Sequence, residues 1–366
     1  MMRNRGVAHS RIQIIAEAGV NHNGSLEKAL QLIDIAKESG ADAVKFQTFK
    51  AQAISNYSAP KAEYQKQNNP IEESQLEMLK RLELDETAHQ SLITHCKDQN
   101  IQFLSTPFDI ASLDMLHKKF NIPQIKIPSG EITNLPFLLK IAKTGKPVIL
   151  STGMSTLGEI ELALAALAFG YIDLSGKPSI EAFQEAFNSI EGQGVLQEKV
   201  ILLHCTTEYP APFEGVNLKA MDTLHDAFGL PVGLSDHTPG IAVSIAAVAR
   251  GASVIEKHFT ISRDLPGPDH RASLEPEELK ALVAAIRQVE VALGCSRKCP
   301  TSGELKNRVV ARKSLVAASD IHQGTAFSEG NIVIKRPGTG ISPARYWELL
   351  GKKAPRDFKQ DELIEI

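Results

Sequence analysis

Two histidines stand at matching places in a repeated pattern of the chain. His237 follows the apolar stretch 231–234, and His258 follows the apolar stretch 253–255. Residues 241–250 between them are rich in alanine and valine, which predicts a helix. A strand–helix–strand unit makes its two strands parallel, so their carboxyl ends lie side by side. We therefore expect both imidazoles to reach one divalent metal ion.

Acidic residues near these strand ends could add oxygen ligands. The candidates are Glu17, Asp236 and Asp269. Mixed nitrogen and oxygen ligation suits Mn²⁺, Fe²⁺ or Co²⁺ better than a sulfur-rich zinc site. The alternative is that each histidine is simply a hydrogen-bonded residue of a barrel, without a metal.

Two lysines lie inside apolar strand sequence. Lys45 stands in Ala-Val-Lys-Phe-Gln and Lys126 in Gln-Ile-Lys-Ile-Pro-Ser. Burying a lone ammonium group is costly, so an inward lysine needs an anionic partner. With the hydroxyls of Ser129, Ser151 and Ser235 and nearby glycine N–H groups, they predict a pocket for a doubly negative ligand. The alternative is a lysine that extends from a strand end into solvent.

Glu17 ends the first strand candidate and is the candidate proton donor or acceptor. Alternatively it orients a lysine or a metal ligand. His22 follows in Asn-His-Asn-Gly, and we interpret it as a residue that holds this turn rather than a catalytic group.

The elements that must position these groups alternate regularly. Helical stretches separate eight strand candidates, at 13–16, 43–46, 101–104, 124–127, 147–150, 200–203, 232–234 and 253–255. This count predicts a (β/α)8 TIM barrel. An open doubly wound sheet is the alternative. Polar residues end nearly every strand, which favours the barrel, because barrel enzymes use the carboxyl ends of all strands whereas open sheets use one crevice.

The remaining segments set the domain boundaries. Residues 1–294 form the predicted barrel domain, 295–308 a linker and 309–366 a small domain with strands at 313–318 and 331–335. Residues 55–70 predict a loop over the active face, and 171–199 an insertion containing a helix-like IEAFQEAF.

The composition excludes several classes of protein. A net charge of -3 and a pI near 6.4 give no reason to expect nucleic acid or a membrane surface as partner. The chain has no apolar run long enough for a membrane span and no signal-peptide pattern at its start, so we expect a cytoplasmic protein. The four cysteines are too few for a disulfide scaffold, and Cys295 and Cys299 lack a second ligand pair for zinc.

Taken together, these motifs resemble the sialic-acid synthases, which form nonulosonic acids from phosphoenolpyruvate and an N-acetylmannosamine-type sugar. The resemblance rests on Glu17-Ala-Gly-Val-Asn-His-Asn-Gly24, Val44-Lys-Phe-Gln-Thr48, Lys126-Ile-Pro-Ser-Gly-Glu131, Ser151-Thr-Gly-Met154, His204-Cys-Thr-Thr-Glu-Tyr-Pro210, Leu234-Ser-Asp-His-Thr238, Glu256-Lys-His-Phe259 and Pro266-Gly-Pro-Asp269. The tail, with Ile334-Lys-Arg-Pro-Gly-Thr-Gly340, resembles the antifreeze-like (SAF) domain, a β-clip-like fold, that closes this family.

The resemblance implies a role for each matching residue. Phosphoenolpyruvate would be held by Lys45, Thr106, Lys126, Ser129, Ser151 and Ser235. His237 and His258 would bind Mn²⁺, with Mg²⁺ or Co²⁺ as alternatives, and Gln47, Glu131, Tyr209 and Asp269 would contact the acylamino sugar. Arg336 would enter the partner subunit's barrel, which implies a domain-swapped homodimer.

Thr207 bears on the choice of sugar. Family members that make N-acetylneuraminate can carry asparagine there, whereas the Thr-Thr-Glu-Tyr of this chain and its insertion look more like the legionaminate-type synthases. The favoured sugar is 2,4-diacetamido-2,4,6-trideoxymannose, with N-acetylmannosamine as the alternative.

Other functions are less well supported by the residues. A keto-deoxy-octulosonate phosphate synthase needs a second basic site for a sugar phosphate, and the sequence offers one lysine-based pocket. A Schiff-base aldolase would use Lys45 or Lys126 as a nucleophile. A non-catalytic sugar- or ice-binding protein would not need so complete a set of polar residues at the strand ends.

Overall fold

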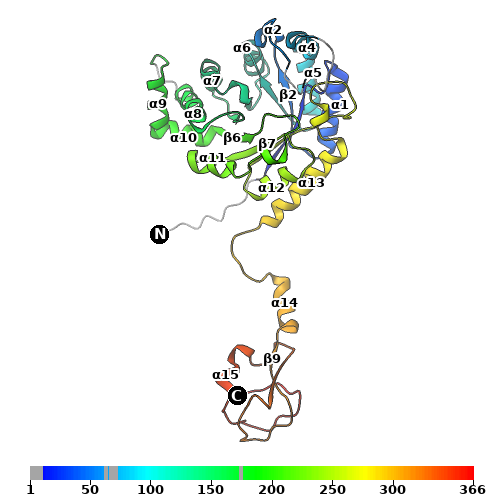
Figure 1. Cartoon of the computed structure of the whole chain (residues 1–366), viewed down its shortest axis with the longest axis vertical. Coiled ribbons are helices and arrows are strands. Elements are labelled where there is room, and N and C mark those ends of the chain that lie inside the picture. The colour runs from blue at the N-terminus through cyan, green and yellow to red at the C-terminus, as the bar shows by residue number, and fades with distance from the viewer. Residues whose placement is uncertain (1–10, 62–64, 66–72, 173–175) are drawn as a thin grey trace. The chain divides into compact units, whose positions relative to one another are not determined.

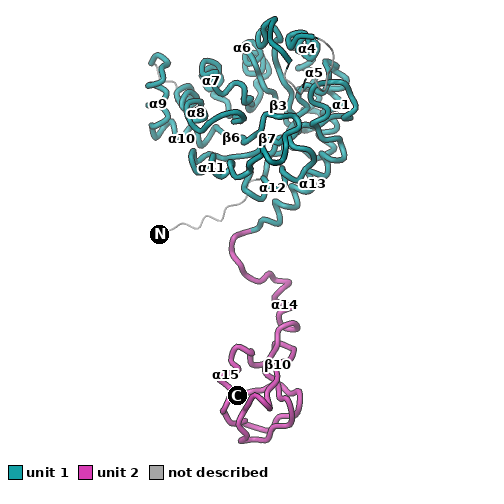
Figure 2. Tube along the Cα trace, viewed as in Figure 1, with its two compact units in different colours: residues 1–294 teal, residues 295–366 magenta. Residues whose placement is uncertain are grey.

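A computed structural model describes residues 11–61, 65, 73–172 and 176–366. The chain divides into two compact units, residues 1–294 and 295–366 (Figure 2).

The first unit is built on a parallel sheet that curls into a barrel. Its strands are β1 (Gln13–Gly19), β2 (Ala43–Thr48), β3 (Gln102–Pro107), β4 (Ile125–Ile127), β5 (Val148–Ser151), β6 (Val200–Cys205), β7 (Val232–Asp236) and β8 (Val254–His258). Their order is β3-β2-β1-β8-β7-β6-β5-β4, so the first and last strands in the sequence are hydrogen-bonded neighbours. This closure between β1 and β8 confirms the predicted TIM-like barrel, because an open doubly wound sheet does not join its first and last strands in this way.

Helices surround the barrel (Figure 1). They are α1 (Leu26–Glu38), α2 (Ala51–Ile54), α4 (Gln75–Leu82), α5 (Glu86–Asp98), α6 (Ile110–Asp114), α7 (Leu135–Ala142), α8 (Leu157–Tyr171), α11 (Ala220–Phe228), α12 (Ala242–Ala249) and α13 (Pro276–Leu293). All eight predicted strands form, and helical segments separate each from the next as expected. The helical segment between β3 and β4 consists of α6 followed by a π-helical turn, Met115–Lys119.

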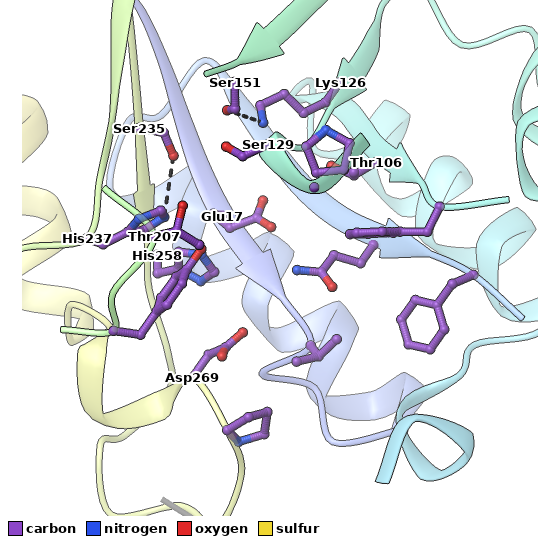
Figure 3. Close-up of a pocket in the computed structure, with 18 of the residues that line it drawn as sticks. Glu17, Thr106, Lys126, Ser129, Ser151, Thr207, Ser235, His237, His258 and Asp269 are labelled. Carbon is purple, nitrogen blue, oxygen red and sulfur yellow. Dashed lines mark hydrogen bonds between the residues drawn. The ribbon is translucent and has the colours of Figure 1, made fainter. Parts of the chain in front are cut away.

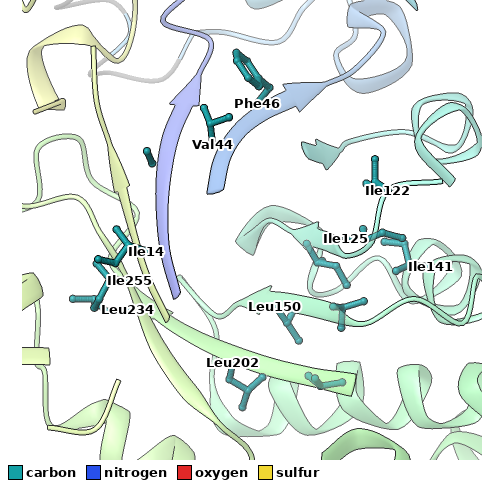
Figure 4. Packing of buried hydrophobic residues seen from close by; sticks show 14 of the residues in the cluster. Ile14, Val44, Phe46, Ile122, Ile125, Ile141, Leu150, Leu202, Leu234 and Ile255 are labelled. Carbon is teal, nitrogen blue, oxygen red and sulfur yellow. The ribbon is translucent and has the colours of Figure 1, made fainter. Parts of the chain in front are cut away.

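The alternation of side chains along each strand separates two apolar regions. Outward residues pack between the sheet and the helices, and Figure 4 shows Ile14, Leu234 and Ile255 together on neighbouring strands. Inward residues fill the base of the barrel in a second cluster, made of Ile15, Ala43, Leu104, Ile149, Leu203 and Val254. Gly233 belongs to the inward set of β7, where a Cβ atom would stand 2.3 Å from the Val254 carbonyl oxygen. The barrel is therefore packed at its base and leaves space only toward the carboxyl ends of its strands.

The insertion before β6 forms two helices, α9 (Ile180–Asn188) and α10 (Ile190–Lys199). The first is the predicted helix, and its Phe183 ring packs edge-on against Phe169 of α8, with ring centroids 5.2 Å apart. The second was not predicted, because its two glycines weaken the helical pattern. Half of the predicted loop at 55–70 lies outside the described residues.

The second unit has its own small core. It contains α14 (Ser302–Ala311), the antiparallel pair β9 (Ser314–Ala317) and β10 (Ile332–Lys335), and α15 (Tyr346–Leu349). The core residues are Leu315, Ala317, Ile321, Phe327, Ile332, Leu349, Ala354, Phe358 and Ile364. Both predicted strands form, while α14 occupies part of the segment expected to be a linker. In the described part of the chain, no helix is long and apolar enough to cross a membrane.

Candidate active site

A cavity of about 450 Å³ opens at the carboxyl ends of the barrel strands. Side chains alternate between the two faces of β1, so Glu17, two residues after Ile15, also points into the barrel. Glu17 is paired in register with Lys45 on one side and His258 on the other. Except for Asp236, the predicted site residues of the barrel line this cavity: Glu17, Lys45, Gln47, Thr106, Lys126, Ser129, Glu131, Ser151, Thr207, Tyr209, Ser235, His237, His258 and Asp269. Ten of them are labelled in Figure 3.

Two lysines and two carboxylates form a buried charged cluster on the floor of the cavity. Lys45 Nζ lies 2.7 Å from Glu17 Oε2 and 3.6 Å from Glu256 Oε2. Lys126 Nζ lies 3.6 Å from the other oxygen of Glu256. All four side chains are at most 5% exposed. Glu256 therefore stands between the two ammonium groups, whereas Glu17 pairs with Lys45 alone.

This arrangement separates the pKa values of the two carboxyl groups. Burial favours the neutral form of both, but Lys126 and Lys45 together outweigh it at Glu256 and lower its pKa to about 2. At Glu17 the effect of burial, which raises the pKa, is larger than the effect of Lys45, which lowers it. The negative charge of Glu256 raises the pKa further, to about 7. A protonated Glu17 leaves two ammonium groups facing one carboxylate. The cluster then carries net positive charge, which an anionic ligand would neutralise.

Hydroxyl groups surround the lysines. Lys45 Nζ donates to Thr106 Oγ1 at 3.0 Å, and Lys126 Nζ donates to Ser151 Oγ at 2.7 Å. The Gly153 N–H donates to Ser129 Oγ at 3.0 Å. Figure 3 shows Thr106, Lys126, Ser129 and Ser151 gathered on one side of the cavity. The predicted anion pocket is thus assembled from β2 to β5 and the turn after β4, except for Ser235 on β7, whose hydroxyl donates to Glu256 Oε1 at 2.8 Å.

The two histidines lie on the opposite side of the cavity, at the ends of β7 and β8, with ring centroids 5.4 Å apart. His237 Nδ1 donates to the Thr206 carbonyl oxygen at 2.6 Å, so Nε2 carries the lone pair of the neutral ring, and Ser235 Oγ lies 3.5 Å from it. Burial lowers the pKa of His237 to about 4 and that of His258 well below its usual range. Among the described residues, nothing hydrogen-bonds the buried Nδ1 of His258.

These features fit a pair of metal ligands, because a divalent cation binds a neutral imidazole through its nitrogen lone pair. In the described ranges, no group of three or more His, Cys, Asp and Glu side chains is arranged around a common metal position. The remaining ligands of an ion here would therefore come from substrate or water.

Asp236 was a candidate oxygen ligand, and the structure places it elsewhere. Its carboxylate points away from the cavity and pairs with Lys257, with Nζ and Oδ2 3.0 Å apart. Thr238 and Ser244 also donate to it, at 2.8 and 2.6 Å. The reason is that successive side chains of a strand point to opposite faces. Asp236 stands between the inward residues Ser235 and His237, so its side chain points outward.

Two of the predicted sugar contacts, Tyr209 and Asp269, lie on the side of the histidines. The Tyr209 ring lies 4.2 Å from that of His237 and 5.8 Å from that of His258, centroid to centroid. Asp269 lies below them in Figure 3, and burial raises its pKa to about 6. Arg336 belongs to the second unit, where its Nε donates to the Ala311 carbonyl oxygen at 3.1 Å.

Sequence reasoning missed Glu256 and Cys205, and it interpreted His22 correctly. Both missed residues line the cavity. Glu256 stands two residues before His258, so strand alternation turns both side chains inward, and this spacing was visible in the sequence. His22 accepts a hydrogen bond from the Gly24 N–H at 3.0 Å and is buried, so it holds the turn as interpreted.

A TIM barrel with a lysine-based anion pocket beside two neutral histidines defines the class: a barrel enzyme that handles an anionic substrate at the strand ends. Comparison with known proteins identifies the family. Residues 32–298 match the NeuB family, and residues 312–365 match the SAF domain. The chain belongs to the NeuB family and carries a SAF domain after its barrel, which confirms the resemblance to sialic-acid synthases.

Two relatives and one solved structure are highly similar over most of the chain. The N,N'-diacetyllegionaminic acid synthase of Campylobacter jejuni is 54% identical, over 96% of this chain and 98% of its own. The N,N'-diacetyllegionaminic acid synthase of Legionella pneumophila is 48% identical, over 93% and 89%. The crystal structure of N-acetylneuraminic acid synthetase from Leptospira borgpetersenii serovar Hardjo-bovis has a TM-score of 0.64 at 32% identity, over 82% of this chain and 90% of that one.

Proposed function

We propose that this protein condenses phosphoenolpyruvate with 2,4-diacetamido-2,4,6-trideoxymannose to give N,N'-diacetyllegionaminate and phosphate. The observation that carries the proposal is that the two lysines, Lys45 and Lys126, and the histidine pair line the same cavity. The 54% identity to an N,N'-diacetyllegionaminic acid synthase supports this sugar over N-acetylmannosamine.

The charged floor is suited to phosphoenolpyruvate. Lys45 and Lys126 would pair with its phosphate and carboxylate, while Thr106, Ser129 and Ser151 would donate hydrogen bonds to the remaining oxygens. Ser235 would join them by turning its hydroxyl away from Glu256 Oε1, to which it donates at 2.8 Å. We expect the proposed reaction to take place in the cytoplasm, as the sequence predicts.

The reaction forms a bond between C3 of phosphoenolpyruvate and the aldehyde carbon of the open-chain sugar. Positive charge then develops at C2, and the Glu256 carboxylate, held ionised by both lysines, lies on the floor to stabilise it. Water adds at C2 and loses a proton, and the tetrahedral intermediate expels phosphate by cleavage of its C2–O bond. Glu17 would give a proton to the aldehyde oxygen, a role suited to a carboxyl group whose pKa lies near neutrality.

A divalent cation, Mn²⁺ by preference, would be held by His237 and His258. Bound there, it would supply Lewis-acid polarisation of the aldehyde. The chain's own contribution is to keep both imidazoles neutral and fixed, His237 through its bond to the Thr206 carbonyl oxygen.

We also propose that the active form is a homodimer in which Arg336 completes the partner's site. Helix α14 supports an assembly, because Leu305, Val309 and Val310 expose 49%, 49% and 67% of their surface. Apolar side chains gathered on one short helix are a common feature of protein interfaces.

The test is product analysis with the purified full chain, Mn²⁺ and phosphoenolpyruvate carrying ¹⁸O at the bridging oxygen. Each sugar is supplied at the same concentration. We expect N,N'-diacetyllegionaminate as the main product and the ¹⁸O label in the released phosphate. Faster turnover of N-acetylmannosamine would overturn the choice of sugar, and retention of the label in the nonulosonate would overturn the C–O cleavage.

A further inference from the structure

One side of the cavity is apolar, and the proposed chemistry does not use it. Seven side chains, which we call the apolar wall, form a cluster separate from the two barrel cores. They are Val20, Phe49, Ile54, Met78, Leu79, Leu82 and Phe108. All seven line the same cavity as Glu17 and the two lysines. The wall is therefore part of the binding site rather than part of the packing around the barrel.

The position of the wall follows from the strands. Val20, Phe49 and Phe108 come directly after the last residues of β1, β2 and β3. They therefore stand just beyond the polar floor, on the β1–β3 side of the barrel mouth. The histidines end β7 and β8, on the other side of β1. A sugar whose aldehyde lies at the histidines would direct its far end toward this wall.

The wall is held in place by specific contacts. The rings of Phe49 and Phe108 meet edge-on, with centroids 6.2 Å apart. Helix α4, which supplies three wall residues, begins with a capping box in which Ser74 and Glu77 bond each other's backbone N–H groups at 2.9 and 3.2 Å. At the other end of α4, Glu83 accepts from the Ala51 N–H of α2 at 2.6 Å. The surface is thus formed before any sugar binds.

Because the wall is apolar, it favours a sugar whose end at the wall is also apolar. Six of its side chains carry no hydrogen-bonding atom, and Met78 has only a thioether. A hydroxyl group pressed against such a surface loses its water without gaining a partner, whereas a methyl group is favoured there. The two candidate sugars differ in this respect, because the trideoxy sugar ends in a C6 methyl group and N-acetylmannosamine ends in a hydroxymethyl group.

We propose that the apolar wall binds the C6 methyl group of the sugar and makes the enzyme selective for 6-deoxy substrates. This inference rests on the proposed function, since it takes the condensation with phosphoenolpyruvate as given. An apolar surface rejects an added hydroxyl only moderately, so we expect a preference of about 10- to 100-fold in kcat/KM.

The test compares two sugars that differ at one position, 2,4-diacetamido-2,4,6-trideoxymannose and its 6-hydroxy counterpart. Leu79 is the residue to change, because it lies on α4 with part of its side chain open to the cavity. Leu79→Gln introduces a polar group of similar size, and Leu79→Met at the same position is the matched apolar control. We expect Leu79→Gln to reduce the preference for the 6-deoxy sugar about tenfold, mainly through KM, and Leu79→Met to keep it.

Further measurements separate this idea from loss of folding and from failure of the proposed function. The KM for phosphoenolpyruvate should stay unchanged in both variants, because Leu79 lies on helix α4 whereas the two lysines lie on β2 and β4. If Leu79→Gln does not fold, Phe108→Tyr adds a single hydroxyl to the wall and should shift the preference in the same direction. Equal loss with both sugars, or no preference in the wild type, would overturn the role of the wall while leaving the reaction intact. A wild type inactive on both sugars would overturn the proposed function itself.

Discussion

Glu17 and Glu256 have the same side chain and stand on neighbouring strands, yet their surroundings give them different protonation. Glu256 faces two ammonium groups and is ionised. Glu17 faces one ammonium group and the charge of Glu256, so its pKa is raised to about 7. In the proposed reaction, this difference suits Glu256 to charge stabilisation and Glu17 to proton transfer. Such a pair divides the work between an acid and an ion, as enzymes with two carboxylates commonly do.

Replacing Glu17 with glutamine should separate catalysis from binding. Glutamine keeps the size of the side chain but carries no acidic proton, so we expect turnover to fall by roughly 100-fold or more. Binding of Mn²⁺, followed by electron paramagnetic resonance, should remain within a few-fold of the wild type because both histidines are unchanged. A variant that retains more than a tenth of the activity would exclude Glu17 as the proton donor.

At the scale of elements, the strands position the site through a strict inward and outward alternation. The same alternation that brings Ser235, His237, Glu256 and His258 into the cavity places Asp236 and Lys257 behind them, between the sheet and the helices. There the ion pair joins β7 to β8, with both side chains 1% exposed. Lys257 Nζ also donates to the Thr238 carbonyl oxygen at 2.5 Å. The pair thus ties together the two strand ends that carry the histidines.

We expect Lys257→Met to lower the free energy of unfolding by about 3–5 kcal/mol, because it leaves the Asp236 carboxylate buried without its counter-charge. The double variant Asp236→Asn/Lys257→Met removes both charges and should recover much of the loss. Urea denaturation of the two variants measures the difference. A loss below about 1 kcal/mol in the single variant would show that hydrogen bonds from Thr238 and Ser244 suffice to hold the carboxylate.

The base of the barrel offers a second test of element packing. Gly233→Ala places a Cβ atom 2.3 Å from the Val254 carbonyl oxygen and 2.7 Å from Leu203. Relief requires movement of the β8 backbone, so we expect a loss of about 1–3 kcal/mol in urea unfolding. Gly158→Ala, in the first turn of α8 with open space around it, is the control and should be neutral or slightly stabilising. Equal effects of the two changes would contradict this account of β7.

At the scale of the whole molecule, the chain consists of two units with separate cores, and one predicted site residue lies outside the barrel. Arg336 is exposed on the second unit. Its predicted role in a partner's cavity requires two copies of the chain, and a symmetric homodimer would complete both sites at once.

Complementation between two inactive variants tests this arrangement. Glu17→Gln disables the barrel and Arg336→Ala disables the second unit. If Arg336 acts in the partner's site, each mixed dimer of the two variants contains one intact site. Random pairing makes half of the dimers mixed, so co-expression should restore about a quarter of wild-type activity. An arginine that acts in its own chain would give no recovery, and so would a monomer.

The sequence by itself determined the barrel, its eight strands and the residues at their ends, because strand alternation and strand–helix repetition are local patterns. Strand alternation would also have identified Glu256, which stands two residues before His258 and so points inward with it. It would have excluded Asp236, which stands one residue before His237 and so points outward. Tertiary structure alone decided which groups meet. Distances across a barrel depend on strand order and closure, so neither the position of Glu256 between Lys45 and Lys126 nor the resulting pKa of Glu17 can be deduced from spacing. The apolar wall is likewise visible only in three dimensions, since its members come from three strand ends and two helices that the chain visits far apart in sequence.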